Sequence, residues 1–152
     1  GKKKYMLNDL IKSDKILFAK SVNSWEEAIH LSGKPLLTDN TIEERYIDKV
    51  ISNVNELGPY ICIAPDIAIS HARPEDGAKS LGMTVLILEQ PVYFGVKKDR
   101  PVRIIITLAA PDNEKHLLAL QQLSRLLMED LDDLLVAKNV DQVLALVEKY
   151  SE

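Results

Sequence analysis

The chain has 152 residues, of which 46% are apolar and 28% are charged, a balance typical of one compact globular domain. Its net charge of −4 makes a nucleic-acid-binding protein unexpected, because phosphate contacts require clustered Lys and Arg, and only Lys2–Lys4 form a basic run. No apolar run approaches the ~20 residues that span a bilayer, and the single Cys62 has no disulfide partner. We therefore expect a cytoplasmic protein with one domain over residues 1–152, a solvated Lys2–Lys4 segment and a buried, inert Cys62 thiol.

Two short elements and a helix are predicted for the amino-terminal part. Residues 6–11 are expected to form a short helix, and the apolar run Ile16–Ala19 a first strand. Ser24–Glu27 has the S-x-x-E pattern of a capping box, in which a hydroxyl and a carboxylate satisfy free backbone amides at a helix start. Gly33 and Pro35 are expected to end this helix.

A second helix is predicted to start at another capping box, Thr41–Glu44. Its apolar residues lie three or four positions apart and therefore share one face: Ile47, Val50, Ile51 and Val54. Gly58 and Pro59 are expected to end the helix, since glycine tolerates the backbone that follows a helix and proline cannot continue one.

Strands are predicted to dominate the middle of the sequence. Ile61–Ala64, Met83–Leu88 and Val102–Leu108 are short runs rich in branched apolar residues. Such runs are too continuous for half-exposed strands, so we expect central strands covered by helices on both faces. Pro91–Gly95 is expected to be an edge segment, and residues 97–100 a turn.

Two helices are predicted near the carboxyl end. The longer helix follows Pro111–Asn113, and His116 stands at the amino end of its core-facing stripe of Leu120, Leu123, Leu127, Leu131 and Leu134. The last helix starts after Asn139 and has on its inner face Val140, Val143, Leu144 and Val147. Without an internal repeat or a linker, the sequence predicts one α/β domain with helices on both faces of a buried sheet.

Three histidines are the candidate reactive groups, because the glycine-rich nucleotide loops, serine elbows and paired metal-ligand motifs of common enzymes are missing from the sequence. We expect no metal and no cofactor. His30 lies near the end of the first capped helix, where a surface histidine is ordinary. His71 lies in the polar segment 66–77 between two predicted strands, a place where function concentrates, although an incidental loop histidine fits equally well.

His116 and Arg73 each have a structural and a functional interpretation. A histidine on an apolar stripe is more often a packed boundary residue, but at a helix start it lies beside free amides and the positive end of the helix dipole. Arg73 can pair with Glu75, Asp76 or an acidic partner, or it can bind phosphoryl oxygens through its planar guanidinium. A docking or structural role is favoured for Arg73 over direct catalysis.

Four segments in order resemble a known family. The first runs from Gly58 to Gly77 and includes His71, and Glu89–Gly95, Pro101–Ala110 and Pro111–Leu117 follow it. Together they resemble the enzyme IIA components of the sugar phosphotransferase system, in the mannitol/fructose superfamily, and the stretch 58–65 is most similar to the ascorbate-specific type. The resemblance covers nearly the whole chain and implies a three-layer α/β/α sandwich with a mixed central sheet.

The resemblance implies a phosphotransferase with a phosphohistidine intermediate. His71 would accept phosphate from the histidine phosphocarrier protein and pass it to a cysteine of enzyme IIB, for ascorbate or a related sugar carried by the membrane enzyme IIC. His116 would orient or stabilise the phosphoryl group. An imidazole suits this chemistry because its nitrogen lone pair is a nucleophile and the ring is a good leaving group.

Other interpretations stay open at this point. A regulatory enzyme IIA-like domain would signal its phosphorylation state instead of driving transport, and a small-molecule binding module would have an incidental histidine loop. A homodimer is also an open possibility.

Two positions depart from the family pattern. Many members have proline before the phosphorylated histidine, where this chain has Ser70, whose hydroxyl would lie near the phosphate. Mannitol-type members have an arginine in the second helix where this chain has Asn53. We therefore treat Ser70, Arg73 and Asn53 as candidate phosphoryl-binding or partner-docking residues.

Overall fold

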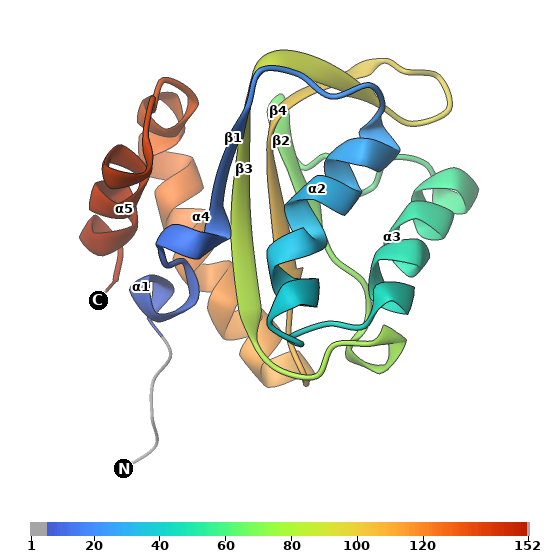
Figure 1. Ribbon diagram of the computed structural model, residues 1–152, viewed down its shortest axis with the longest axis horizontal. Coiled ribbons are helices and arrows are strands. Elements are labelled where there is room, and N and C mark those ends of the chain that lie inside the picture. The colour runs from blue at the N-terminus through green and yellow to red at the C-terminus, as the bar shows by residue number, and fades with distance from the viewer. Residues whose placement is uncertain (1–5, 152) are drawn as a thin grey trace.

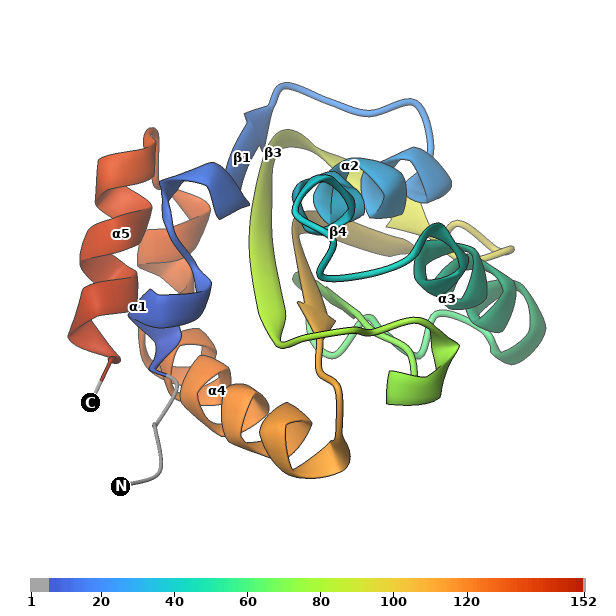
Figure 2. The ribbon, with the colours of Figure 1, turned by 60° about the horizontal axis from the view of Figure 1, so that its bottom comes forward.

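The computed structural model describes residues 6–151, so the predicted solvated segment Lys2–Lys4 lies outside the described residues. A four-stranded sheet stands nearly edge-on between two groups of helices (Figure 1). One face is covered by α2 (Trp25–Thr38) and α3 (Glu44–Leu57). The other face is covered by α1 (Leu7–Leu10), α4 (Asn113–Leu135) and α5 (Val140–Lys149), as Figure 2 also shows. The predicted three-layer α/β/α sandwich is confirmed.

The sheet is mixed, as predicted. Its order is β1-β3-β4-β2, formed by β1 (Ile16–Ala19), β3 (Gly82–Phe94), β4 (Arg100–Ala109) and β2 (Asp66–Ser70). β1 is parallel to β3 and β2 is parallel to β4, whereas β3 and β4 are antiparallel. The carboxyl ends of β2 and β4 therefore lie at the same sheet edge as the amino ends of β1 and β3. Residues that follow β2 and β4 meet at this edge.

The central strands are buried on both faces because their apolar residues alternate between two cores. Val85 and Ile87 of β3 pack toward α4 and α5, whereas Leu86 and Leu88 pack toward α2 and α3. This double burial explains the continuous apolar runs in β3 and β4 and confirms the strands predicted over 83–88 and 102–108.

The strand predicted over Ile61–Ala64 is wrong. The strand next to β4 is Asp66–Ser70, which had been assigned to the polar connection before His71. Asp66 has a φ of 72°, so the chain turns sharply there, and Ile69 donates a backbone hydrogen bond to the carbonyl of Ile61. The earlier apolar run thus lies beside β2 as a turn.

Cys62 lies in this turn and is half-buried rather than buried. Burial raises the pKa of its thiol to about 11, so at neutral pH the group is a thiol and not a reactive thiolate. The expected inert character of Cys62 is therefore supported, although its depth was overestimated.

The end predicted for the first helix is also wrong, because α2 continues through Pro35 to Thr38. Half of the predicted capping box forms at its start, because the Ser24 hydroxyl accepts a hydrogen bond from the Glu27 amide. The Glu27 carboxylate accepts from the backbone amide of Asn23 instead of that of Ser24. Gly33 has a packing role, since a β-carbon there would lie 2.7 Å from Cδ1 of Ile47 in α3. The glycine lets the two helices approach instead of ending the first one.

The capping box predicted for the second helix does not form. α3 begins at Glu44, and Glu43 caps it without a side-chain hydrogen bond. The Thr41 hydroxyl instead donates to the Asp39 carboxylate at 2.6 Å. The predicted end is right, because Gly58 follows the helix with a φ of 87° and a ψ of 179°, a backbone region essentially restricted to glycine.

The remaining predicted elements are confirmed with two adjustments. Residues 92–94 continue β3 rather than forming a separate segment. Because β1 ends opposite Leu88, these residues pair only with β4, and the other side of the strand is a sheet edge as predicted. The turn predicted over residues 97–100 lies at 95–98 instead, and Arg100 already begins β4. Asp112 caps α4 by accepting a hydrogen bond from the Lys115 amide, and Asn139 caps α5 in the same way from Gln142.

Candidate active site

His71 follows the last residue of β2 and lies at the sheet edge where β4 also ends. Its ring Nδ1 is 2.7 Å from the carbonyl oxygen of Ile69. A carbonyl can only accept a hydrogen bond, so Nδ1 must have the proton and donate it. In the neutral ring, Nε2 then has the free lone pair. The backbone of β2 therefore selects which nitrogen of His71 can act as a nucleophile.

His116 comes from a different element and meets His71 at this edge. It lies in the first turn of α4, and its ring centroid is 5.6 Å from that of His71, with an angle of 62° between the planes. Burial, followed by the nearby charge of His71, holds the pKa of His116 below its ordinary value. At neutral pH the His116 ring is therefore uncharged, with one nitrogen able to donate a hydrogen bond.

Tyr60 contacts the other side of His71, and the sequence interpretation had given it no role. Its hydroxyl donates a 3.0 Å hydrogen bond to the backbone carbonyl of His71, and the two rings meet edge to face at 5.6 Å. Burial raises the pKa of Tyr60, against the lowering effect of a hydrogen bond from the Asn53 side chain. Asn53 is thus linked to the site through Tyr60.

Tyr46 is a second residue that the sequence interpretation missed. Its hydroxyl accepts a hydrogen bond from the Ala72 amide at 3.0 Å and donates one to the Leu108 carbonyl at 2.7 Å. The side chain is buried, and burial raises the pKa of its hydroxyl to about 12. Because Ala72 follows His71 directly, Tyr46 ties the histidine loop to the end of β4. Its place beside Ile47 on the apolar side of α3 was the only signal in the sequence.

Ser70 and Arg73 flank His71 in different environments. Ser70 is buried opposite Thr107, and its hydroxyl makes no hydrogen bond to any residue between 6 and 151. Arg73 is exposed, and its backbone amide donates to Asp76. Its guanidinium forms no ion pair with Glu75 or Asp76, which removes that one of the alternatives left open by the sequence. The exposed Arg73 guanidinium therefore keeps its hydrogen-bonding capacity for a ligand, whereas the Ser70 hydroxyl is covered by other residues.

The other candidate groups do not join this site. His30 lies exposed on α2, on a helix that covers the sheet. Within residues 6–151 no cluster of His, Cys, Asp and Glu has the arrangement to hold a metal ion. Nor does this stretch have a helix long and apolar enough to cross a membrane.

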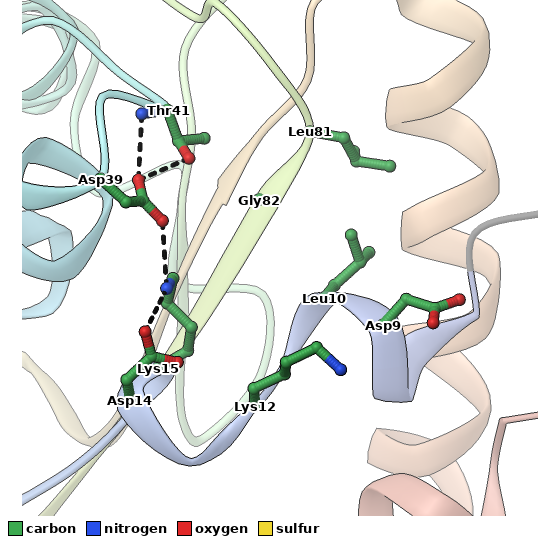
Figure 3. Close-up of a pocket in the computed structure, with 9 residues that line it drawn as sticks. All are labelled: Asp9, Leu10, Lys12, Asp14, Lys15, Asp39, Thr41, Leu81 and Gly82. Carbon is green, nitrogen blue, oxygen red and sulfur yellow. Dashed lines mark hydrogen bonds and ion pairs between the residues drawn. The ribbon is translucent and has the colours of Figure 1, made fainter.

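A small cavity near the same sheet edge is separate from the histidines. Figure 3 shows it between the starts of β1 and β3, and its volume is about 190 Å³. Its most buried charge, Lys15, pairs with Asp14 at 2.9 Å and with Asp39 at 3.0 Å. These pairs connect the end of α2 to the start of β1, which is a structural role. The candidate site is therefore the histidine pair at the surface.

Comparison with known proteins decides the family. The model of the phosphoenolpyruvate-dependent sugar phosphotransferase system, EIIA 2, matches residues 9–150. The chain belongs to this enzyme IIA family. Membership gives it the general role of a phosphoryl carrier in a sugar phosphotransferase system and confirms the resemblance seen in the sequence.

Curated relatives of this enzyme IIA include two named specificities. The mannitol-specific cryptic phosphotransferase enzyme IIA component of Escherichia coli (strain K12) is 39% identical over 145 residues, which is 94% of this chain and 98% of the relative. The ascorbate-specific EIIA component of Salmonella choleraesuis (strain SC-B67) is 30% identical over 145 residues, 93% of this chain and 94% of the relative.

Solved structures share the fold of this enzyme IIA. The solution structure of the mannitol-specific cryptic enzyme IIA from Escherichia coli superposes with a TM-score of 0.87 at 38% identity, covering 95% of this chain and 99% of that chain. An Escherichia coli complex of mannitol enzyme IIA with phosphorylated mannitol enzyme IIB has a TM-score of 0.78 at 25% identity, covering 92% and 99%.

Proposed function

We propose that Nε2 of His71 accepts a phosphoryl group from the histidine phosphocarrier protein and passes it to a cysteine of enzyme IIB. One observation supports the choice of atom most strongly: the 2.7 Å hydrogen bond from Nδ1 to the Ile69 carbonyl, which leaves Nε2 as the nucleophile. The proposal places this exchange in the cytoplasm, within a transport system for ascorbate or a related sugar whose membrane component is enzyme IIC.

The transfer is a displacement at phosphorus in both directions. The Nε2 lone pair of His71 attacks the phosphorus, the donor's N–P bond breaks, and its electron pair returns to the donor imidazole. In the second step a thiolate of enzyme IIB attacks, a P–S bond forms, and the electron pair of the N–P bond returns to His71. Such a loose transition state requires positioning more than covalent help from the protein.

The groups around His71 suit the oxygens of a phosphoryl group. The uncharged His116 ring can donate a hydrogen bond from the amino end of α4, where the helix dipole also favours an anion. The exposed Arg73 guanidinium has no internal partner in the described chain and is available as a further donor, whereas the Ser70 hydroxyl is buried and could donate only if the loop moved. Asn53 would contribute indirectly, through its interaction with the Tyr60 hydroxyl.

An apolar rim supports docking of protein partners. Tyr60 contacts His71, Leu117 and Leu118 directly follow His116 in α4, and these three side chains are 39%, 56% and 51% exposed. Exposed apolar side chains around a shallow polar centre are typical of protein interfaces. The related mannitol enzyme IIA that forms a complex with phosphorylated enzyme IIB supports enzyme IIB as one of the partners.

The experiment is transfer of labelled phosphate between purified proteins. With a phosphorylated phosphocarrier protein as donor, the wild-type chain should gain acid-labile, base-stable phosphate and lose it to enzyme IIB. His71→Ala should stay folded and gain none, whereas His30→Ala, a matched histidine change on α2, should be labelled as wild type. Undiminished labelling of His71→Ala would refute the proposal. Labelling without rapid onward transfer would favour a regulatory role instead.

A further inference from the structure

A second cavity lies at the sheet edge opposite to His71. The end of β1 and nearby residues of β3 and β4 form one side of it, the end of α4 and the loop toward α5 form the other, and its volume is about 280 Å³. Phe18, Ile87 and Leu135 contribute apolar surface. Thr107 of β4 pairs with Ser70, the residue before His71. Arg103 lies four residues earlier on β4, which is roughly 13 Å along the strand. The cavity is therefore distinct from the histidine site.

The charges around this cavity are unbalanced. Lys20, Arg103 and Lys138 line it, against a single carboxylate, Glu89, which leaves three positive charges and one negative charge, or +2. In a chain whose net charge is −4, this is a local excess of positive charge. None of the four side chains takes part in an ion pair with another residue in the 6–151 range. The cavity thus has two more positive than negative side chains, and none of them is ion-paired within the described residues.

Arg103 is held in a defined position. Its Nε donates to the Leu88 carbonyl at 3.1 Å, and one terminal nitrogen donates to the Leu135 carbonyl at 3.2 Å. These bonds use two of the five N–H groups of a guanidinium, and the other three are available to a ligand. Because the backbone of β3 and α4 fixes the planar fork, little side-chain freedom would be lost when an anion binds.

We propose that this cavity binds a small organic phosphate monoester, with Arg103, Lys20 and Lys138 around the phosphate and the apolar lining against its carbon skeleton. A phosphate monoester is close to a dianion at neutral pH and matches the +2 charge, whereas one carboxylate would leave a positive charge uncompensated. A guanidinium fork can bind phosphate through two parallel hydrogen bonds. The volume is just below the ~300 Å³ at which most ligand sites begin, which suits a hexose phosphate better than a nucleotide.

The test is an NMR titration of the unphosphorylated protein with glucose 6-phosphate, inorganic phosphate and glucose. Glucose 6-phosphate should shift the amides of Lys20, Glu89 and Lys138 to saturation, inorganic phosphate should do so more weakly, and glucose should not. Lys138→Gln should weaken binding by up to about fivefold and Glu89→Gln should strengthen it by a similar factor, as expected for single exposed charges. Lys34→Gln, an equal change of charge at an exposed lysine on α2, should have no effect.

Three results would overturn this proposal. One is a set of shifts confined to residues around His71, because the phosphate would then occupy the phosphoryl-transfer site. Another is unchanged affinity in both Lys138→Gln and Glu89→Gln, which alter exposed side chains and should leave the fold intact. The third is an equal response to glucose, which would show that charge plays no part.

Discussion

Replacing Tyr46 by phenylalanine tests how the histidine loop is held. The change removes one hydroxyl and keeps the ring, so the Ala72 amide loses its 3.0 Å partner and the Leu108 carbonyl loses its 2.7 Å donor. Both residues are buried, and water cannot replace the hydroxyl there. A buried backbone group without a partner costs about 1–3 kcal/mol. The Leu108 carbonyl has a second lone pair that can still accept a hydrogen bond, so the main cost comes from the Ala72 amide. We therefore expect Tyr46→Phe to lose about 2 kcal/mol of unfolding free energy.

Urea unfolding followed by circular dichroism measures this loss, with Tyr93→Phe as the matched control. Tyr93 is 49% exposed, and its hydroxyl has no hydrogen bond within the described chain, so its removal should change stability by less than about 0.5 kcal/mol. The folded Tyr46→Phe protein should also accept phosphate more slowly, because the loop after His71 is released. Equal stability of the two variants, together with wild-type phosphorylation by Tyr46→Phe, would refute the positioning role.

Three further predictions concern the site and its support. His116→Ala should still be phosphorylated, but onward transfer should slow by on the order of a hundredfold, as expected for loss of one hydrogen-bond donor to the transition state. Rapid-quench kinetics measures both half-reactions, and unchanged rates in both would mean that His116 has only a packing role. The lowered pKa of His116 means that unfolding takes up protons, so stability should fall as pH drops below about 6.5, and this fall should be shallower in His116→Gln. Parallel pH profiles would contradict that assignment. Gly58→Ala should cost about 1–3 kcal/mol in urea unfolding because of its φ of 87° and ψ of 179°, and a neutral result would mean that the turn can rearrange.

Local patterns predicted most of the secondary structure, and long-range pairing accounts for the errors. The apolar spacing of α4 and the branched runs of β3 and β4 are properties of the sequence near each residue, and these elements were right. Residues 61–64 and 66–70 are both short apolar segments, and only the pairing of Ile67–Ser70 with β4 decides between them. Pro35 stays inside α2 because packing of that helix on the sheet outweighs the local cost of proline.

The candidate site was predictable in part for a similar reason. The importance of His71 and His116 followed from the family resemblance, whereas residue spacing left each with an ordinary structural interpretation. The roles of Tyr46 and Tyr60 depend on hydrogen bonds to backbone carbonyls, and Leu108 is 62 positions away from Tyr46 in the chain. Such partners have no local pattern, so a tyrosine of this kind becomes visible only once the sheet edge is assembled.

The atom that receives the phosphoryl group is the most direct test of the proposed mechanism. Phosphorus and ¹⁵N NMR of the phosphorylated protein can distinguish the two nitrogens of a histidine ring. The hydrogen bond from Nδ1 of His71 to Ile69 predicts a single phosphohistidine, with the N–P bond at Nε2 of His71. Phosphate on Nδ1, on His116 or on a residue away from this edge would contradict it.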